Sequence, residues 1–379
     1  MELDRLREEI DCIDKDLVKL IERRLAVAKS IGQYKKDRGL RILDPNRELE
    51  VIAKNLKHVE SLDAEEYVQE ILEKLMSVSR KAQSEVVIDE DTPLDEIIGD
   101  VVLGDKVIDP IVAFGGIKGS YGEQAVIQHF GTEVKELSFK TFNEVVAAVL
   151  SGEADYGVLP MENTSTGNIL DVERLLENNQ IYIAGEEIVE VAHCLLGLGK
   201  LEDIKTVYSH VQGFLQSSDF LKEHNFKEIP YFNTAISAKF VAESGDKTLG
   251  AIASKRAAEV YGLKVLKEHI NFNSDNFTRF IIIRRVLELD SSCNKVSVQV
   301  ILEDKEGSLL KVIKSITENR LNMVKIASRP IIGKPFEYIF SIDFNGNIKD
   351  KNVKQALKEI KEQSVLMSFK GNYKEVRGK

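Results

Sequence analysis

The sequence predicts a multidomain protein that combines an all-α N-terminal domain, a two-lobed α/β central domain and a small α+β C-terminal domain. Three patterns support this prediction. Apolar residues recur every three or four positions over residues 1–84, strand and helix signals alternate over 111–285, and a β-α-β-β-α-β order fills 296–376. The length of 379 residues suits roughly two to four domains. A hydrophobic content of 43% is enough for packed cores.

Residues 1–84 predict three helices, of which the first is by far the longest. An apolar stripe marks one face of it: Leu3, Leu6, Ile10, Ile13, Leu17, Leu20, Val27 and Ile31. About 35 helical residues extend roughly 50 Å, which is more than one small domain encloses. We therefore expect this helix to pack against a partner chain, in a homo-oligomer that is at least a dimer. Asp44 as N-cap and Pro45 at the first helical position begin a second helix that ends near residue 58, and a third runs from residue 61 or 63 to about residue 83.

Residues 85–110 carry most of the negative charge. This segment has nine acidic residues and one lysine, a net charge of −8 out of −10 for the whole chain, whereas residues 1–84 balance 17 basic against 18 acidic residues. Such a composition predicts a solvated linker, in which the apolar pairs could still dock locally. Because no basic face is left elsewhere, nucleic acid is excluded as a partner.

Cysteine, histidine and hydropathy patterns predict a cytoplasmic protein. Cys12, Cys194 and Cys293 lie far apart without a CxxC spacing, and the six histidines include no HxxxH pair, so neither a disulfide framework nor a metal site is expected. The N-terminal MELDRLREE is charged and lacks the apolar core of a secretion signal. No run approaches the roughly 20 apolar residues of a membrane-spanning helix, so no membrane partner is expected.

Residues 111–285 predict an α/β domain of two lobes with a cleft between them. The first block is a strand at 111–114 that ends in a glycine loop, a helix from about residue 122, a helix over 142–151 and a buried strand at 156–160. The second block has strands at 206–210, 250–254 and 278–283, with helices from about residues 212 and 255 and over 235–244.

Residues 296–376 predict a small ferredoxin-like sandwich, because strands and helices follow in the order β-α-β-β-α-β. The strands are expected over 296–302, 321–327, 338–344 and 366–371, and the helices over about 308–319 and 350–363.

A basic residue, Arg24, interrupts the apolar stripe of the first helix. A buried charge is costly without a partner, so Arg24 either extends to solvent, meets an acid or faces an anionic ligand. Lys35 lies eleven residues later, about three turns, and therefore on the same face. Arg7 lies seventeen residues before Arg24, about 100° away around the helix, so it could serve the same pocket only from a partner helix.

Polar residues on the second and third helices complete this pattern. Arg47 and Glu48 stand in the first turn after the cap Asp44, and Ser79 and Gln83 share a helix face at i, i+4. Together with the two basic residues of the first helix, this set resembles the all-helical chorismate mutases over essentially all of residues 1–84. Two short motifs strengthen the resemblance: LRxxIDxID (6–14) and DPxRE (44–48).

The resemblance implies a Claisen rearrangement of chorismate to prephenate, which needs neither a nucleophile nor a cofactor. Arg7 from the neighbouring protomer, Arg24 and Arg47 would hold the two substrate carboxylates, because bidentate arginines suit carboxylates. Lys35 and Gln83 would face the ether oxygen, where preorganised donors stabilise the charge that grows in the transition state. Three further residues would hold the ring hydroxyl and orient the other groups: Glu48, Asp44 and Ser79.

The glycine loop GGIKGSYGE at 115–123 first suggests a dinucleotide site, but it lacks the GxGxxG spacing. A tight strand-to-helix turn is the simpler interpretation. A wider set of segments resembles prephenate dehydratase in order and spacing across 111–285: KGSYGE (118–123), MENTSTGNI (161–169), YSHVQGFLQ (208–216), NTAISA (233–238), AIASKRAAEVYGL (251–263) and NFTRF (276–280). This family implies a two-lobed fold like that of periplasmic binding proteins.

The dehydratase resemblance implies that Thr278 is the donor to the departing hydroxyl of prephenate and that Arg279 anchors a carboxylate. A threonine is a weak acid, so it is expected to polarise that hydroxyl or relay a proton. The matched motifs supply further groups that would line the cleft: Glu162, Asn163, Thr164, Ser209, His210 and Gln212. Thr164 and His210 could instead only cap loops. Thr164 stands where the family commonly has serine, and Val211 where it has proline.

The C-terminal pattern resembles the ACT domain, a small amino-acid-sensing module. Two motifs carry this resemblance: Gly307-Ser308-Leu309-Leu310 and Ala327-Ser328-Arg329-Pro330. A glycine that opens a helix leaves N–H groups for a ligand carboxylate. The resemblance to the ACT domains of dehydratases implies that this ligand is L-phenylalanine, acting as an allosteric effector. Ser308 and Ala327 replace the alanine and glutamate of the family pattern. A purely structural dimerisation domain is the alternative.

In this order the domains resemble the bifunctional chorismate mutase–prephenate dehydratases, which supply phenylpyruvate for phenylalanine biosynthesis. Chorismate and prephenate are then the substrates, and no metal or other cofactor is expected. Three alternatives stay open: an arogenate dehydratase, a nicotinamide-dependent prephenate dehydrogenase, and a two-lobed small-molecule binder with a sensor tail. The missing GxGxxG and the presence of NFTRF argue against the dehydrogenase.

Overall fold

The computed structural model describes residues 2–40, 42, 44–87, 92–273, 275–331, 333–334 and 337–376 of the chain. It divides into two compact units. The first comprises Met1–Gly99, Lys305–Leu321 and Ile348–Ser364, and the second comprises Asp100–Asp304, Asn322–Asn347 and Val365–Lys379. In the described residues the first unit is helical, and the second contains the sheets.

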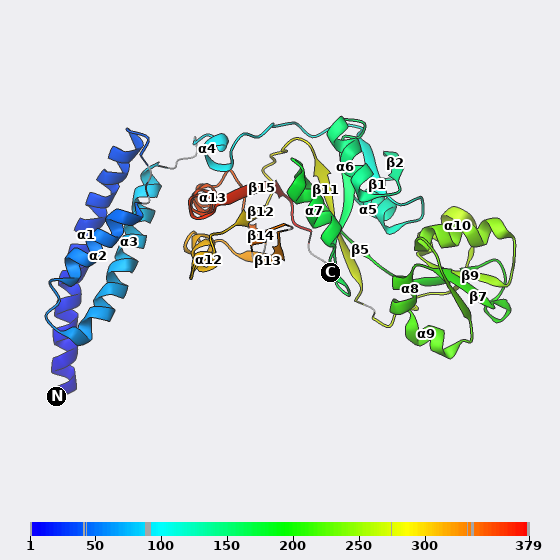
Figure 1. Cartoon of the computed structure of the whole chain (residues 1–379), viewed down its shortest axis with the longest axis horizontal. Helices are drawn as coiled ribbons and strands as arrows, with labels where there is room; N and C mark the ends of the chain where they lie inside the picture. Colours follow the sequence, from blue (N-terminus) through cyan, green and yellow to red (C-terminus); the bar gives the residue numbers. More distant parts are fainter. Residues whose placement is uncertain are drawn as a thin grey trace. The chain divides into compact units, whose positions relative to one another are not determined.

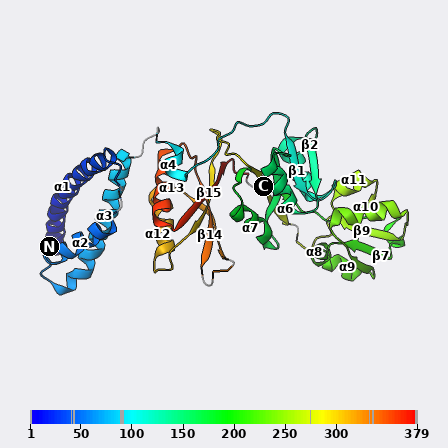
Figure 2. The same cartoon turned by 45° about the horizontal axis from the view of Figure 1, so that its top comes forward.

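The N-terminal helices of the first unit follow the prediction closely. Their bounds are α1 (Glu2–Lys36), α2 (Pro45–Leu56), the 3-10 turn η1 (Leu62–Ala64) and α3 (Glu65–Val87). Figure 2 shows α1 and α3 side by side. Gly32 allows their close approach, because a Cβ at this position would lie 2.8 Å from the Cα of Gln83. Gln83 is thereby fixed against the C-terminal half of α1.

The same unit contains helices from two distant segments: α4 (Leu94–Ile98), α12 (Ser308–Glu318) and α13 (Lys351–Gln363). α4 packs against α13 and buries Ile97 and Ile98. Part of the acidic connector 85–110 thus docks through its apolar residues, whereas residues 88–91 of the connector lie outside the described residues.

The second unit begins with an α/β lobe, in which a returning strand occupies a central place (Figure 1). Its elements are β1 (Ile111–Gly115), α5 (Tyr121–Phe130), β2 (Lys135–Phe139), α6 (Phe142–Ser151), β3 (Tyr156–Asn163), β4 (Gly167–Asn168), α7 (Leu170–Asn178), β5 (Tyr182–Glu190) and β11 (Phe277–Arg284). The strand order is β2-β1-β3-β11-β5, with β4 paired to β3. β1 is parallel to β2 and β3, whereas β11 is antiparallel to both of its neighbours.

Helices cover both faces of this sheet. On one face, Ile281 packs in a core with Val145 of α6 and Leu176 of α7. On the other face, Ile282 packs with Val126 of α5. Because consecutive residues of β11 enter different cores, this strand presents alternate side chains to the two faces of the sheet.

A second α/β lobe is inserted between β5 and β11. Its elements are β6 (Cys194–Gly197), η2 (Leu201–Asp203), β7 (Thr206–Ser209), α8 (Val211–Gln216), α9 (Ser218–Glu223), β8 (Lys227–Pro230), α10 (Thr234–Ser244), β9 (Leu249–Ala253), α11 (Lys255–Tyr261) and β10 (Lys264–Lys267). The strand order is β10-β6-β9-β7-β8. α10 lies on one side of this sheet, and α8 and α9 lie on the other (Figure 1). The prediction of two α/β lobes is therefore confirmed.

The remaining strands form an antiparallel sheet that belongs to the second unit. They are β12 (Lys295–Ile301), β13 (Met323–Pro330), β14 (Tyr338–Asn345) and β15 (Leu366–Tyr373), in the order β13-β14-β12-β15. This is the strand order of a ferredoxin-like β-α-β-β-α-β chain. β15 contacts β5, and Tyr373 is fully buried in the core of the first lobe. Gly371 permits this contact, because a Cβ there would collide with the carbonyl oxygen of Ile183.

Several elements of the α/β lobes were not predicted, namely β2, β4, β5, β6, β8, β10, α7 and α9. Among the described residues, no helix combines the length and the apolar character needed to cross a membrane.

Candidate functional sites

Arg24 connects α1 to α3. Its guanidinium donates a 2.8 Å hydrogen bond to the carbonyl oxygen of Leu75 and a second hydrogen bond to the hydroxyl of Ser79. The interruption of the apolar stripe therefore places a cation against a polar position of α3, and Arg24 remains half-buried. Two of the predicted site residues are in direct contact here.

Lys35 is in the last turn of α1, and Gln83 of α3 lies against this end of α1. The Lys35 ammonium donates a 2.6 Å hydrogen bond to the carbonyl oxygen of Ile42. Gln83 faces Gly32 across the α1–α3 contact, and its side-chain oxygen is buried without a hydrogen-bond partner in the described part of the chain. An unpaired buried polar group is costly, so this oxygen marks a place where a ligand or water could bind.

The polar residues of α2 have other partners. Asp44 caps the helix by accepting a 3.1 Å hydrogen bond from the backbone N–H of Arg47. The Arg47 guanidinium pairs with Glu50 at 3.0 Å and is 66% exposed. Glu48 forms an ion pair with Arg80 of α3, a residue that the sequence analysis did not select although it directly follows Ser79 in the chain.

The apolar stripe of α1 is exposed in the single chain. Side-chain exposure along it ranges from 44% for Ile31 to 63% for Leu20. Arg7 is also exposed, at 68%, and its nearest acid is Asp4 at 3.6 Å. Within one chain Arg24 contacts Ser79, and Gln83 lies against Gly32, three residues before Lys35. The exposed Arg7 has no contact with these residues, as expected if it acts on a partner chain.

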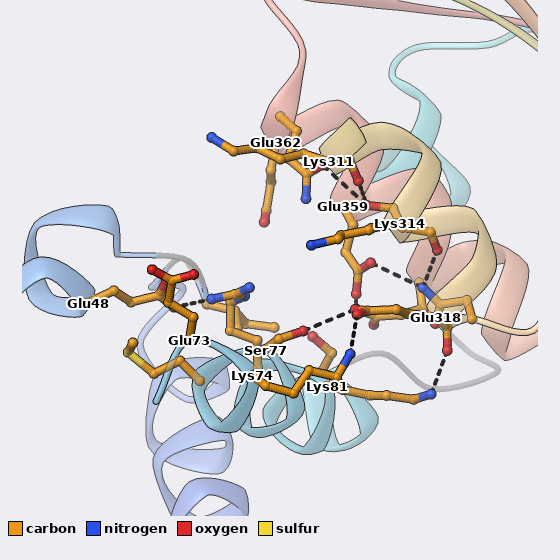
Figure 3. A pocket seen from close by; sticks show the side chains of 18 of the residues that line it. Glu48, Glu73, Lys74, Ser77, Lys81, Lys311, Lys314, Glu318, Glu359 and Glu362 are labelled. Atoms are coloured by element: carbon orange, nitrogen blue, oxygen red, sulfur yellow. Dashed lines mark hydrogen bonds and ion pairs between the residues drawn. The ribbon is translucent and has the colours of Figure 1, made fainter. Parts of the chain in front are cut away.

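A pocket of about 680 Å³ lies on a different face of α3, within the helical unit (Figure 3). Its charged lining is balanced, with Lys74, Arg80, Lys81, Lys311, Lys314 and Lys358 opposed by Glu48, Glu70, Glu73, Glu318, Glu359 and Glu362. Such a lining does not select a dianion, so this pocket is not the predicted cationic site.

Glu318 of α12 is the centre of the contacts across this pocket. It accepts hydrogen bonds from Lys74 at 2.8 Å and from Ser77 at 3.0 Å, and its carbonyl oxygen accepts one from Lys81 at 2.7 Å (Figure 3). Although burial acts against it, hydrogen bonding from Lys74 and Ser77 lowers the pKa of Glu318. The deeper Glu359 shows the opposite effect, because burial raises its pKa.

The second group of predicted residues meets where β3 and β11 pair. Thr278 of β11 stands opposite Asn163 of β3 and is buried. The Asn163 amide nitrogen donates to the Thr278 hydroxyl oxygen at 2.9 Å and to the side-chain oxygen of Asn276 at 2.8 Å. Its amide oxygen accepts from the backbone N–H groups of Ser165 and Thr166 at 3.0 and 3.1 Å. These two N–H donors fix the amide orientation, so nitrogen rather than oxygen faces Thr278.

Glu162 and Arg279 pair across the same two strands but on the opposite face of the sheet. The Arg279 guanidinium bonds to Glu186 at 2.6 Å and to the Tyr373 hydroxyl at 2.8 Å. Glu162 pairs with Lys325 of β13 at 2.7 Å. The side chains of Glu162 and Arg279 therefore do not face the Thr278 hydroxyl, because side chains of neighbouring strand residues point to opposite faces.

The Thr164 hydroxyl forms hydrogen bonds with backbone groups. It accepts a 2.9 Å hydrogen bond from the N–H of Phe277 and donates one of 2.9 Å to the carbonyl oxygen of Asp275. Thr164 therefore holds the turn after β3 against the start of β11. Both hydrogen-bonding directions of its hydroxyl are used by the chain, which is the loop-capping role that was one of its two interpretations.

Three predicted residues lie in the second lobe, at the end of β7 and the start of α8. Ser209 is fully buried and donates to the carbonyl oxygen of Ile252 at 3.0 Å. His210 is the exposed N-cap of α8 and accepts from the N–H of Gln212 at 3.2 Å. His210 thus has the capping role that was one of its two interpretations, and Ser209 has a structural hydrogen bond.

The glycine loop contacts the second lobe. The Ser254 hydroxyl donates to the carbonyl oxygen of Gly119 at 2.8 Å, and the Tyr261 hydroxyl donates to that of Lys118 at 2.6 Å. Glu123, at the start of α5, is buried and pairs with Arg256 of α11 at 3.3 Å. The loop is therefore a turn that joins the two lobes, which agrees with the simpler interpretation of its sequence.

The two C-terminal motifs have separate surroundings. Gly307, with φ of 76°, is the N-cap residue of α12, and no side chain caps this helix end. Arg329 on β13 is buried and forms an ion pair with Glu177 of α7. Ser328 and Leu310 are exposed. Glu173, also on α7, is buried, and burial raises its pKa.

Comparison with known families matches both parts of the chain. A family model described as chorismate mutase type II matches residues 6–84, and one described as prephenate dehydratase matches residues 112–287. The bifunctional chorismate mutase/prephenate dehydratase of Aquifex aeolicus (strain VF5) is 31% identical over 375 residues, which cover 98% of this chain and 98% of that protein.

Solved structures resemble the second part of the chain. The prephenate dehydratase of Arthrobacter aurescens in complex with L-Phe is 29% identical, with a TM-score of 0.64, over 70% of this chain and 90% of that one. GqqA, described as a novel type of quorum quenching acylase, is also 29% identical, with a TM-score of 0.65, over 70% of this chain and 98% of that one.

Proposed function

We propose which residues carry out each reaction of this chain, which belongs to the bifunctional chorismate mutase/prephenate dehydratase family. The enzyme converts chorismate to prephenate and prephenate to phenylpyruvate in phenylalanine biosynthesis. The contact of Arg24 with Ser79 carries the first assignment. The contact of Asn163 with Thr278 carries the second.

The mutase site is proposed around Arg24, Lys35 and Gln83. Chorismate is a flexible dianion that must be held in a folded conformer while negative charge grows on its breaking ether oxygen. Arg24 is positioned by α3 to bind a carboxylate, and Lys35 supplies a cation on the same helix face. The Gln83 side-chain oxygen is buried without a hydrogen-bond partner in the described residues, and we assign the role of donor to the ether oxygen to the side-chain nitrogen of the same amide. These donors act by orientation and electrostatic stabilisation, which is all that this rearrangement requires.

The site is completed in a dimer. The exposed apolar stripe of α1 supports pairing with a second copy, because burying these side chains removes apolar surface from water. Arg7 would then reach the site of the partner subunit. Arg47 and Glu48, which face Glu50 and Arg80 here, would exchange these partners for the substrate.

The dehydratase step is proposed to depend on the proton of Thr278. Because the Asn163 amide donates to the Thr278 oxygen, the hydroxyl proton of Thr278 is left to point toward the departing hydroxyl of prephenate. Loss of that hydroxyl and of carbon dioxide makes the ring aromatic, so a positioned weak donor is sufficient. From the second lobe, His210 and Gln212 at the start of α8 are proposed to contact the substrate, whereas the buried Ser209 hydroxyl holds the end of β7 against β9.

The C-terminal strands and helices are proposed to form an ACT module that binds L-phenylalanine and inhibits the enzyme. The ferredoxin-like strand order supports this assignment. So does the similarity to the Arthrobacter enzyme, whose structure contains L-Phe. Inhibition requires that the effector favours one of two conformations of the catalytic region.

One assay tests the whole assignment. Purified enzyme receives chorismate, and chorismate loss and phenylpyruvate appearance are followed with and without L-phenylalanine. We expect both reactions, with inhibition by the effector. Parallel assays with prephenate and arogenate distinguish the two possible dehydratase substrates, and the fused mutase favours prephenate. Chorismate loss without phenylpyruvate or phenylalanine formation would show that the second domain is a non-catalytic binder.

Thr278→Val tests the donor role, because valine keeps the shape and removes the hydroxyl. We expect phenylpyruvate formation to fall at least ~100-fold, the scale of losing one preorganised donor. The mutase rate and the circular dichroism spectrum should not change. Retained dehydratase turnover would remove Thr278 from the mechanism.

A further inference from the structure

The two neighbouring residues Thr278 and Arg279 face different partners, and this arrangement couples the reaction site to the C-terminal sheet. Thr278 faces Asn163, whereas Arg279 reaches β14 and β15 on the opposite face of the lobe sheet. We name the second set the sheet–lobe contact, and it consists of Glu186, Arg279, Lys295, Asp343 and Tyr373.

Arg279 is the centre of the sheet–lobe contact. Its Nε donates to Glu186 of β5 at 2.6 Å, one Nη donates to the Tyr373 hydroxyl at 2.8 Å, and the other lies 3.3 Å from Asp343. Its side chain is only 14% exposed. One guanidinium therefore links a strand of the lobe to two strands of the C-terminal sheet through charge-assisted hydrogen bonds, which are stronger and more directional than neutral ones.

The partners of Arg279 are themselves fixed. Lys295 of β12 lies 3.1 Å from both carboxylate oxygens of Glu186, and the Ser297 hydroxyl donates to Asp343 at 2.6 Å. Each of the two buried acids therefore lies beside a base, and Lys295 also lies 3.9 Å from Glu375. Glu186 is 1% exposed, so little solvent can replace a lost partner.

The geometry of β11 explains why this contact bears on catalysis. The pairing of β11 with β3 is irregular between Arg279 and Phe280, directly beside Thr278. An irregular pair holds a strand less firmly and redirects its side chains. β11 pairs regularly with β5 from Phe277 to Ile282, and Arg279 adds a side-chain restraint where the pairing with β3 is disrupted.

We propose that Arg279 is a positioning residue for the dehydration, which sets the direction of the Thr278 hydroxyl through its bonds to Glu186, Asp343 and Tyr373. The inference rests on the proposed role of Thr278. It replaces the substrate-anchor role expected for Arg279, and it makes the C-terminal sheet part of the structure that holds the dehydratase site.

The principal test is the steady-state kinetics of Arg279→Met with prephenate. We expect kcat to fall roughly 10–100-fold, the scale of a displaced reacting group, with KM changed less than about threefold. Arg279→Lys should recover part of kcat, because lysine can still pair with one of the two acids. The mutase rate of the same preparations measures the fraction of active protein.

Arg284→Met is the matched control. Arg284 lies on the same strand, is similarly buried and pairs with Glu288, but it is six residues, roughly 20 Å, from Thr278. Its substitution should lower the thermal unfolding temperature without lowering dehydratase kcat. Equal loss of kcat in the two methionine variants would show that Arg279 matters only for stability, and would overturn the proposal.

Two other results would also overturn it. A KM raised at least about tenfold with kcat preserved would mean that Arg279 binds substrate directly. An unchanged kcat and KM would mean that the contact does not reach Thr278. If Arg279→Met does not fold, Tyr373→Phe removes a single hydroxyl from the sheet–lobe contact, and it should lower kcat several-fold. An unchanged kcat in Tyr373→Phe would then contradict the proposal.

Thr278→Val, measured in parallel, separates this proposal from the assignment on which it rests. If Thr278→Val is inactive and Arg279→Met is normal, only the positioning role fails. If Thr278→Val retains turnover, the donor assignment fails whatever the result for Arg279.

Discussion

The ammonium group of Lys35 lies at the end of α1 and is held by the carbonyl oxygen of Ile42 at 2.6 Å. In the proposed mutase site it faces the ether oxygen that gains negative charge. Lys35→Ala removes this donor, so mutase kcat should fall at least ~100-fold with a smaller change in KM. The disappearance of chorismate absorbance measures the rate. Lys36→Ala, one residue further along the same helix, is the control and should keep the wild-type mutase rate. The dehydratase rate should not change in either variant. An unaffected mutase in Lys35→Ala would contradict the assigned role.

Lys370 is a buried lysine whose charge opposes folding. It lies on β15, is 4% exposed and donates to the carbonyl oxygen of Leu176 at the end of α7. Burial lowers the pKa of Lys370 to about 8, below the ordinary value of 10.5. Between these two values the unfolded chain binds more protons than the folded chain. The free energy of unfolding therefore rises with pH in this window, and the contribution is constant below it.

Urea unfolding of the wild type and of Lys370→Met, followed by near-ultraviolet circular dichroism, tests this prediction. From pH 7.5 to 9.5 the wild type should gain about 1–2 kcal/mol relative to the variant. Lys374→Met replaces an exposed lysine four residues later and should leave the pH dependence unchanged. Parallel pH curves for wild type and Lys370→Met would contradict the prediction, because they would show that the pKa of Lys370 is the same in the folded and the unfolded chain.

At the residue scale, a site residue can be predicted from the sequence when it breaks a local pattern. Arg24 is visible as a cation in an apolar stripe, and the structure indeed gives it a partner on α3. Arg279 is not visible in this way, because its partners Glu186, Asp343 and Tyr373 come from distant parts of the chain. Strand alternation alone could have shown that Arg279 and Thr278 point to opposite faces.

At the scale of elements, α1 has an apolar face that its own chain leaves exposed. α3 covers only part of α1, whose buried residues Ala28 and Gly32 lie in its second half. Ile13→Glu combined with Leu20→Glu places two charges on the stripe, where they would be buried in a dimer. We expect mutase activity to fall at least ~100-fold, because desolvating unpaired charges opposes association.

Sedimentation velocity and the two activity assays provide the readouts for this prediction. The dehydratase rate should persist, and the association constant should fall. Lys15→Glu, on the opposite side of α1, is the control and should keep both activities. A fully active mutase in the double variant would show that the stripe is not part of the interface.

Local signals explain which elements were predictable. α6 has the predicted bounds, because Thr141 and Glu144 form a capping box at its start and Gly152 adopts the left-handed conformation at its end. β5 was missed because its sequence YIAGEEIVE carries acids in a buried strand. Glu186 is stabilised there by Arg279, Lys295 and the backbone N–H of Val376, and no local pattern reveals these partners.

At the scale of the whole molecule, the proposed mutase site cannot be completed by one chain. Arg24 and Lys35 belong to one protomer, whereas the exposed Arg7 would come from its partner subunit. A dimer with two-fold symmetry then contains two equivalent shared sites. This arrangement predicts complementation between chains that are inactive on their own.

Co-expression of an Arg7→Ala chain with an Arg24→Ala chain tests this prediction. In a mixed dimer, one site contains both substitutions and the other contains neither. Random pairing makes half of the dimers mixed, so about one quarter of the wild-type mutase activity should return. Arg24→Ala with Arg47→Ala is the control, because both residues serve the site of their own chain and every mixed site keeps one defect. No recovery in the test pair would mean that Arg7 acts within its own protomer. Recovery in the control would mean that Arg24 and Arg47 do not serve the same site.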